Sequence, residues 1–245
     1  MVGVGWLRLV AVNIDGVLLE DSFTPVIRRF VERRGVVYTA ALERAVLSQP
    51  QVEAAGVLVG LGVAGSPKEV VAAYFEERAA YVKEQPVRVV PGALALLERL
   101  RATGVQLVCY GGLEYRHFEE HLGSWASYFD GPRYVCTDGF RPGVREIAED
   151  VFGLAAERVL FIDDVARVAE RARELGAAFV GHPGRGFQRE FMRDAGVRHV
   201  VDSLGAIDDR LLRTVDAEAA SGTLWPSAPT ASGPASGTGR ADGSA

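Results

Sequence analysis

One apolar run near the start of the chain restricts what this sequence can fold into. Residues 7–18 read Leu-Arg-Leu-Val-Ala-Val-Asn-Ile-Asp-Gly-Val-Leu, a β-branched stretch that ends in polar residues and a glycine. This pattern predicts a buried strand that carries Asn13 and Asp15 to its carboxyl end. In an open α/β sheet, ligands bind and chemistry takes place at that end. The run therefore indicates an α/β fold with a site at Asn13 and Asp15.

Strand-like and helical patterns alternate over the second half of the chain. Apolar runs at 105–109 and 158–162 predict two more buried strands, which end in Tyr110 and in the pair Asp163-Asp164. The alternation predicts a parallel sheet whose strands are joined by right-handed crossovers. Shorter strands are expected at 133–137, 178–180 and 199–201.

Composition and periodicity divide the chain into three parts. Residues 20–88 carry only helical patterns, including a helix that begins at Ser66-Pro67, and this block is too long for a simple crossover. We therefore expect an α/β core formed by 1–19 and 89–220, with 20–88 as a small all-helical domain. Residues 221–245 are Ser, Gly, Ala, Thr and Pro with almost no core-forming residues, a composition typical of a disordered tail.

Charge and hydropathy exclude several classes of partner. The net charge is −5 and no basic run offers phosphate contacts, so no nucleic-acid partner is expected. No apolar stretch reaches the length of about 18 residues that a membrane span requires. Cys109 and Cys136 do not make a disulfide framework, which favours a reducing, cytoplasmic compartment. Oligomeric state is not determined by the sequence.

Taken in order, the polar motifs resemble those of the haloacid dehalogenase (HAD) superfamily. Asn13-x-Asp15-Gly16 is similar to the family's first motif, Asp-x-Asp-Gly-x-Leu. It is followed by Tyr110-Gly111-Gly112, Arg141-Pro142 and Asp163-Asp164, each at a strand end or a helix start. The resemblance covers roughly residues 7–205. It implies a Rossmann-like parallel-sheet core with an all-helical cap of the C1 type, which lies over the active site and selects the substrate.

The resemblance also implies phosphoryl transfer through an aspartyl-phosphate, but the key position has changed. The family's nucleophile falls on Asn13, and a carboxamide oxygen is a poor, uncharged nucleophile. The general acid/base falls on Asp15, which is intact. The Ser or Thr that binds the phosphoryl oxygens falls on Tyr110. The family's lysine falls on Arg141, whose forked guanidinium does not replace a lysine ammonium one for one.

Family members usually bind Mg²⁺, and the resemblance assigns that metal to Asp15, Asp163, Asp164 and the position of Asn13. Because Mg²⁺ prefers charged oxygens, a neutral amide at residue 13 predicts weaker binding than in the family. Without the metal, the carboxyl groups crowd together. At least one of their pKa values should then rise, which would make Asp15 a better proton donor near neutrality.

Each of these residues also has a purely structural interpretation. Asp15 can cap a strand end, and Asp163-Asp164 can cap the helix that follows. Tyr110 can fill an abandoned phosphate pocket, and Arg141 can pair with one of the two aspartates. The histidines show no metal-ligand spacing, so no role is assigned to His117, His121 or His199. The loop 181–186, with His182 and Arg185, is interpreted as a plain turn in preference to a part of the site.

Three functions remain open. The first is an enzyme without phospho-aspartate chemistry, in which Asp15 acts as general acid/base on a small, biosynthetic molecule under the cap. Tyr110 and Arg141 would orient that molecule for a cyclisation, dehydration or isomerisation. The second is a catalytically inactive pseudo-phosphatase that binds a ligand or acts as a scaffold. The third is a weak Mg²⁺-dependent phosphatase.

Overall fold

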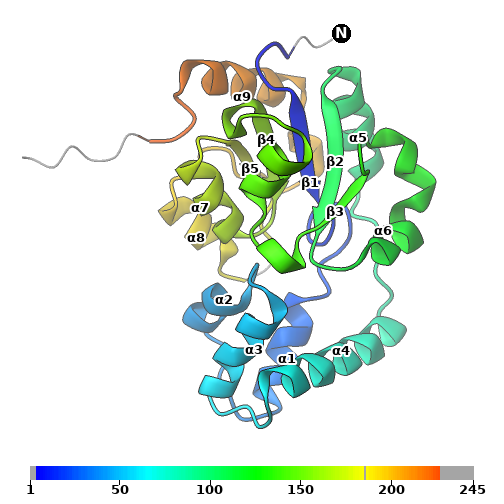
Figure 1. The fold of residues 1–245 in the computed structure, drawn as a ribbon, viewed down its shortest axis with the longest axis vertical. Coiled ribbons are helices and arrows are strands. Elements are labelled where there is room, and N and C mark those ends of the chain that lie inside the picture. Colours follow the sequence, from blue (N-terminus) through cyan, green and yellow to red (C-terminus); the bar gives the residue numbers. More distant parts are fainter. Residues whose placement is uncertain (1–3, 185, 227–245) are drawn as a thin grey trace, which may run out of the picture.

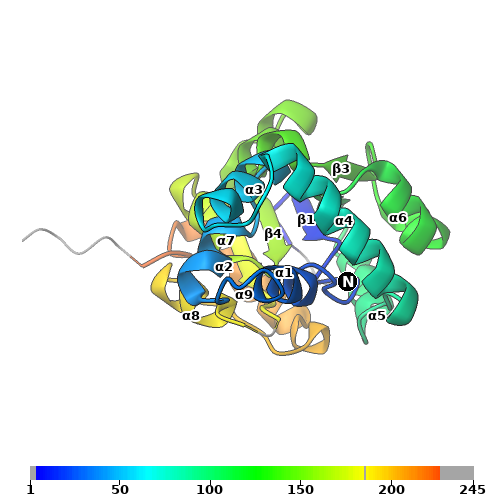
Figure 2. The same cartoon turned by 90° about the horizontal axis from the view of Figure 1, so that it is seen from below.

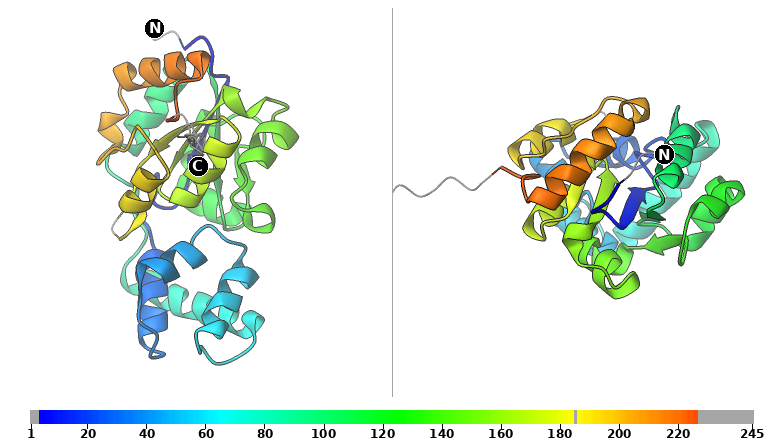
Figure 3. Two further views of the ribbon diagram at one scale, coloured as in Figure 1. Left: turned by 90° about the vertical axis from the view of Figure 1, so that its left-hand side faces the viewer. Right: turned by 90° about the horizontal axis from the view of Figure 1, so that it is seen from above.

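The chain folds into two lobes, an α/β core and a helical cap (Figure 1). The computed structural model describes residues 4–184 and 186–226. Figure 3 shows the cap as a separate group of helices beyond one end of the sheet. Two short connectors join the lobes and run side by side, since the amide of Glu20 donates to the carbonyl of Arg88 at 2.8 Å. The predicted α/β core with an all-helical cap is therefore confirmed.

The core is built on a five-stranded sheet whose order is β3-β2-β1-β4-β5. Every neighbouring pair is parallel, as the alternating pattern predicted. The strands are β1 (Leu9–Asn13), β2 (Gln106–Gly111), β3 (Tyr134–Cys136), β4 (Val159–Asp163) and β5 (Ala178–Gly181). The carboxyl ends of β1, β2 and β4 meet at one edge because these strands are direct neighbours. This edge faces the cap.

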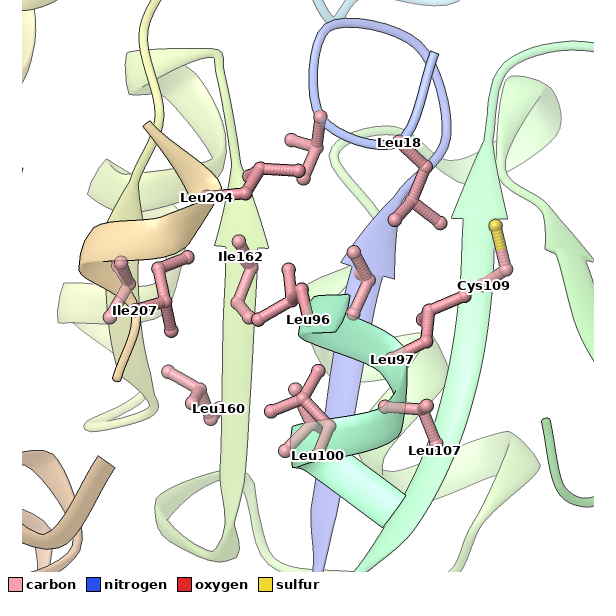
Figure 4. Close-up of a cluster of buried hydrophobic side chains, with 14 of the residues drawn as sticks. Leu18, Leu96, Leu97, Leu100, Leu107, Cys109, Leu160, Ile162, Leu204 and Ile207 are labelled. Atoms are coloured by element: carbon pink, nitrogen blue, oxygen red, sulfur yellow. The ribbon is translucent and has the colours of Figure 1, made fainter. Parts of the chain in front are cut away.

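Helices cover both faces of the sheet because the strand side chains alternate between apolar layers. One face packs against α5 (Ala93–Ala102), α6 (Tyr115–Leu122) and α9 (Asp209–Ser221). The other packs against α7 (Ala166–Glu174) and α8 (Gln188–Asp194). Figure 4 shows the first layer, in which leucines of α5 lie against the strands; its labelled members include Leu96, Leu97, Leu100, Leu107, Leu160 and Ile162.

The cap consists of four helices with an apolar core of their own. They are α1 (Thr24–Glu32), α2 (Ala40–Val46), α3 (Gln51–Gly60) and α4 (Pro67–Glu84). As the sequence predicted, α4 begins at Ser66, whose side chain forms a capping box with Glu69. Phe30, Leu42 and Val70 are buried between the helices, so the cap does not depend on the sheet for its packing.

A buried carboxylate holds the cap against the core. Glu43 of α2 has no exposed surface. It accepts hydrogen bonds from Nε2 of Gln188 at 2.7 Å, from the amide of Phe187 at 3.1 Å and from the hydroxyl of Tyr38 at 2.8 Å. Gln188 and Phe187 belong to the core, so this Glu43 contact joins the lobes at a point remote from the two connectors.

Three parts of the core differ from the predicted elements. The segment 199–201 makes only an isolated bridge from Val200 to β5, and a π-helical turn, Glu146–Val151, replaces the helix expected after Pro142. Residues 224 and 225, which were predicted to belong to the tail, pack on the core. Leu224 is buried and the indole of Trp225 donates to the carbonyl of Ala177 at 3.0 Å, because these two apolar residues still find a surface on the core. Residues 227–245 of the predicted tail lie outside the described residues, as does Arg185.

Within the described ranges, no helix combines the length and the apolar character needed to cross a membrane.

Candidate active site

A cavity of about 140 Å³ lies between the cap and the carboxyl ends of the central strands. Figure 2 looks from the cap side, where the cap helices lie in front of β1 and β4. The core supplies a polar floor that includes Asn13, Asp15, Gly112, Arg141 and Asp164. The cap supplies a largely apolar wall, which includes Phe23, Ile27, Val46, Leu47, Leu58, Val70, Val71, Tyr74 and Phe75. The site predicted at the end of the first strand thus adjoins a cavity beneath the cap.

The side-chain amide of Asn13 is fully engaged with its neighbours. Its Nδ2 donates to the carbonyl oxygen of Asp15 at 2.8 Å and to Oδ1 of Asp164 at 2.9 Å. The close approach of Asp164 requires a glycine at residue 16, where an added Cβ would lie 2.1 Å from Oδ2 of Asp164. One amide hydrogen of Asn13 therefore binds the turn that follows β1, the other joins β1 to the loop after β4, and only the side-chain carbonyl oxygen remains as an acceptor.

Asp15 forms a buried pair with a histidine that the sequence analysis left without a role. Nε2 of His117, on α6, lies 2.9 Å from Oδ1 of Asp15, and the side chains of both residues are about 9% exposed. His121, one turn further along α6, lies against His117 with ring centroids 4.8 Å apart. Because α6 follows β2 after only three residues, its first turn starts at the same edge of the sheet. That short connection was the one signal in the sequence for His117.

Tyr110 pairs with Asn13 in the register of β1 and β2, but its side chain does not line the cavity. Its hydroxyl donates to Oδ2 of Asp163 at 2.5 Å, and its ring packs edge-on against Phe161. Burial and the neighbouring Asp163 hold the pKa of Tyr110 well above its usual value, so the phenol stays protonated and donates. Burial raises the pKa of Asp163 to about 6. The hydroxyl of Tyr110 is therefore used within the core, and its side chain does not fill the cavity.

Gly111, the next residue of β2, lies close to the side chain of Asn13. A Cβ added there would lie 3.7 Å from Oδ1 of Asn13 and 2.5 Å from Cγ2 of Ile14. A hydroxyl side chain at residue 111 would therefore lie near Asn13, whereas the hydroxyl of Tyr110 is bound to Asp163. β2 therefore offers no side-chain hydroxyl to a group bound at Asn13.

Arg141 lies across the backbone of Gly112 at the edge of the cavity. A Cβ added to Gly112 would lie 1.5 Å from Nη2 of Arg141, so the guanidinium takes the space that a side chain would need. No hydrogen bond or ion pair joins Arg141 to any residue that the structure describes. The expected alternative, a pair with Asp163 or Asp164, is not formed. A partly buried cation with five N–H donors thus faces the cavity.

Carboxyl groups around the floor are shifted towards their protonated forms. Burial, followed by the neighbouring charge of Asp163, raises the pKa of Asp164 well above its usual value. Burial also raises the pKa of Asp21, which lines the cavity from the cap side and accepts from the amides of Phe23 and Thr24. The floor therefore carries less negative charge near neutrality than its carboxyl groups suggest.

The family resemblance implies a Mg²⁺ site around Asn13, but the groups present there do not suit that ion. The Asp15 carbonyl and Asp164 Oδ1, two oxygens assigned to the metal, accept from the amide of Asn13 instead. Asp163 is occupied by Tyr110 and by the amide of Val165. Across residues 4–184 and 186–226, no three His, Cys, Asp or Glu side chains form a group that could hold a metal ion. An N–H donor is repelled by a cation, so these contacts and a bound Mg²⁺ exclude each other.

Comparison with known proteins identifies the fold. No family model matches the sequence, and no curated protein matches it. A HAD hydrolase of family IA, variant 3, from Entamoeba histolytica matches 86% of this chain and 100% of its own, with 13% identity and a TM-score of 0.64. A β-phosphoglucomutase from Clostridium difficile matches 86% and 98%, with 14% identity and a TM-score of 0.65. A phosphonoacetaldehyde hydrolase-like protein from Oleispira antarctica matches 90% and 96%, with 15% identity and a TM-score of 0.63.

These similarities extend over the core and the cap together, and their low identity restricts them to architecture. The chain therefore has the fold of capped HAD hydrolases, with Asn13 at the end of its central strand.

Proposed function

We propose that this protein is an enzyme that moves a proton on a small molecule bound beneath the cap, without passing a phosphoryl group through residue 13. Asp15 would act as the general acid/base. The observation that carries the proposal is the buried pair at the cavity floor, in which Nε2 of His117 lies 2.9 Å from Oδ1 of Asp15. A carboxyl group oriented by a second side chain is the arrangement that acid–base catalysis requires.

Three features support the absence of phosphoryl transfer. The carbonyl oxygen of Asn13 is uncharged, and its amide nitrogen is held by two acceptors. The hydroxyl of Tyr110, at the position of the family's Ser or Thr, is bound to Asp163, and Arg141 lies over Gly112 where the family carries a lysine. An aspartyl-phosphate needs an anionic attacking oxygen and groups that neutralise the incoming phosphate. A biosynthetic role and a cytoplasmic location remain predictions from the sequence.

Incubation with acetyl phosphate or an aryl phosphate in the presence of Mg²⁺ tests the absence of phosphoryl transfer. We expect no phosphoryl adduct in the intact mass spectrum and no release of the aryl alcohol. Asn13→Asp is the reference variant, because it restores the carboxylate of the family motif. An adduct on the unmodified protein, or turnover that depends on Asp15, would instead favour the weak phosphatase.

Proton transfer is tested by incubating bound small molecules in D₂O and following the loss of C–H signals by NMR. The exchange should require Asp15 and should disappear in Asp15→Asn. Ligand binding that shows no exchange in either form would favour the second candidate, a binding protein built on an inactive scaffold.

A further inference from the structure

The cavity between cap and core has two chemically different ends, which together restrict what it can hold. Its wall is formed by side chains such as Ile27 of α1, Leu58 of α3, and Val71 and Phe75 of α4. These side chains offer no hydrogen bonds, whereas Thr24, Ser48, Gln49 and Gln51 place polar atoms elsewhere along the cap side of the cavity. The part of a ligand that lies against the apolar side chains must be apolar, since polar groups placed there would lose their water without compensation.

The volume of the cavity sets the size of the apolar part. The space measures about 140 Å³. An apolar cavity of roughly 150 Å³ in another protein holds one benzene molecule. The whole cavity, polar floor included, therefore has room for a body about the size of one six-membered ring.

The floor supplies a donor for one oxygen atom. The guanidinium of Arg141 has no partner among the described residues, and it lines the same cavity as Asp15 and Asn13. Partly buried N–H donors are stabilised when they meet an acceptor, and a charged donor strengthens that hydrogen bond. Arg141 is the one lysine or arginine among the described residues that line the cavity, and it lies there with the carboxyl groups of Asp15, Asp21 and Asp164. A single cation does not balance a phosphate dianion. A neutral oxygen needs no such balance.

We infer that the cavity binds a carbonyl compound whose apolar body is about one ring in size. Its carbonyl oxygen accepts from Arg141, and its body lies against the cap wall of α1, α3 and α4. This inference rests on the proposed function and specifies its substrate class. In the reaction it implies, Asp15 removes a proton from the carbon beside the carbonyl. The C–H electron pair becomes the enolate, whose oxygen lies on Arg141, and Asp15 then returns the proton to carbon.

A panel of four compounds with the same ring tests the inference: acetophenone, ethylbenzene, benzoate and phenyl phosphate. Binding is measured by calorimetric titration of the full chain. We expect acetophenone to bind more tightly than ethylbenzene by about tenfold, the value of one charge-assisted hydrogen bond. Benzoate and phenyl phosphate should bind more weakly than acetophenone. Tighter binding of either anion would overturn the inference and identify an anion site, and failure of every compound to bind would overturn it as well.

The variant Arg141→Met separates the contribution of the guanidinium to binding from that of the apolar wall. It should remove the preference for acetophenone over ethylbenzene and leave ethylbenzene binding unchanged. Arg145→Met is the matched control, because Arg145 pairs with Glu146 at the surface and does not line the cavity. Its ligand preference should equal that of the unmodified protein. A preference for acetophenone that persists in Arg141→Met would contradict the assigned role of the guanidinium.

Exchange of the acetophenone methyl hydrogens in D₂O distinguishes this inference from the proposed function. Binding with the expected selectivity but without exchange would contradict acid–base catalysis by Asp15 and would leave the ligand class in place. Exchange that is lost in Asp15→Asn would support both.

Discussion

Nε2 of His117 lies 2.9 Å from Oδ1 of Asp15, although the two residues are 102 positions apart in the chain. The pair joins Asp15, which lines the cavity, to α6. It gives Asp15 a fixed orientation towards the space under the cap, and it removes one carboxylate oxygen from the set that a metal could use.

Loss of the histidine should destabilise the fold. His117→Phe keeps a ring of similar shape but leaves Oδ1 of Asp15 buried without its partner. We expect the free energy of unfolding in urea to fall by about 1–3 kcal/mol, the usual effect of an unsatisfied buried polar group. His117→Gln keeps a donor and should lose less.

His121→Phe is the control for this measurement, because His121 lies beside His117 and makes no hydrogen bond to Asp15. An equal loss of stability in the two phenylalanine variants would show that packing, and not the pair with Asp15, stabilises this region.

Restoring the carboxylate at residue 13 should create affinity for Mg²⁺. Asn13→Asp removes the amide hydrogens that bind the Asp15 carbonyl and Asp164, and it adds a charged oxygen between them. We expect the affinity for Mg²⁺, measured by titration calorimetry, to increase by about tenfold or more over the unmodified protein.

Asn13→Ala shows how much of the change in Mg²⁺ affinity comes from losing the amide alone, because it removes the donor without adding an anion. Its Mg²⁺ affinity should stay below that of Asn13→Asp. If the unmodified protein already binds Mg²⁺ as tightly as Asn13→Asp, the amide of Asn13 does not block the metal.

Asp21 should make the stability of the protein depend on pH. Burial raises its pKa in the folded state above the usual value of 3.8, so the native state keeps this proton at pH values where the unfolded chain has released it. The contribution of this group to stability is therefore complete below that value and is lost as the pH rises through the raised pKa.

Asp21→Asn removes this titration and keeps an oxygen that accepts from the amides of Phe23 and Thr24. We expect the unmodified protein to lose stability relative to Asp21→Asn as the pH is raised from about 4 to about 8 in urea titrations. Glu32→Gln, at an exposed ion pair, should show no comparable change. If the unmodified protein instead gains stability relative to Asp21→Asn as the pH rises, the pKa of Asp21 is not raised.

The Glu43 contact should stabilise the cap against the core. Glu43→Ala leaves the donors on Gln188, Phe187 and Tyr38 without their acceptor. We expect a loss of roughly 3 kcal/mol in the free energy of unfolding and faster amide hydrogen exchange in α2.

Glu170→Ala provides the comparison, since it removes an exposed ion pair between the same two lobes, with Arg44. Such pairs contribute roughly 0–1 kcal/mol. A similar effect of the two alanine variants would show that burial of Glu43 gives it no special importance.

Local patterns in the sequence were sufficient to predict the fold. The β-branched runs of β1 and β4 and the capping box at Ser66 depend on neighbouring residues, so each could be identified without knowledge of the rest. The order in which strands and helices alternate then determined a parallel sheet.

The site was harder to predict because it depends on which way individual side chains point. A shift of one residue along a strand moves a side chain to the opposite face of the sheet. Tyr110 and Gly111 are consecutive, and an added Cβ at Gly111 would lie near Asn13, whereas the hydroxyl of Tyr110 reaches Asp163. The pair of His117 and Asp15 joins segments distant in sequence, and the short connection before α6 was its one local signal. The roles predicted for Asp15 and Arg141 in catalysis remain predictions.

Because Glu43 is buried among three donors, the helical lobe is fastened to the sheet on the side away from its two connectors. The cap is thus attached to the core at two separate places, the connectors and the Glu43 contact, and not at a single hinge. We therefore expect the entrance to keep a nearly constant width, so that the protein rejects bulky molecules by their dimensions before any chemical recognition takes place.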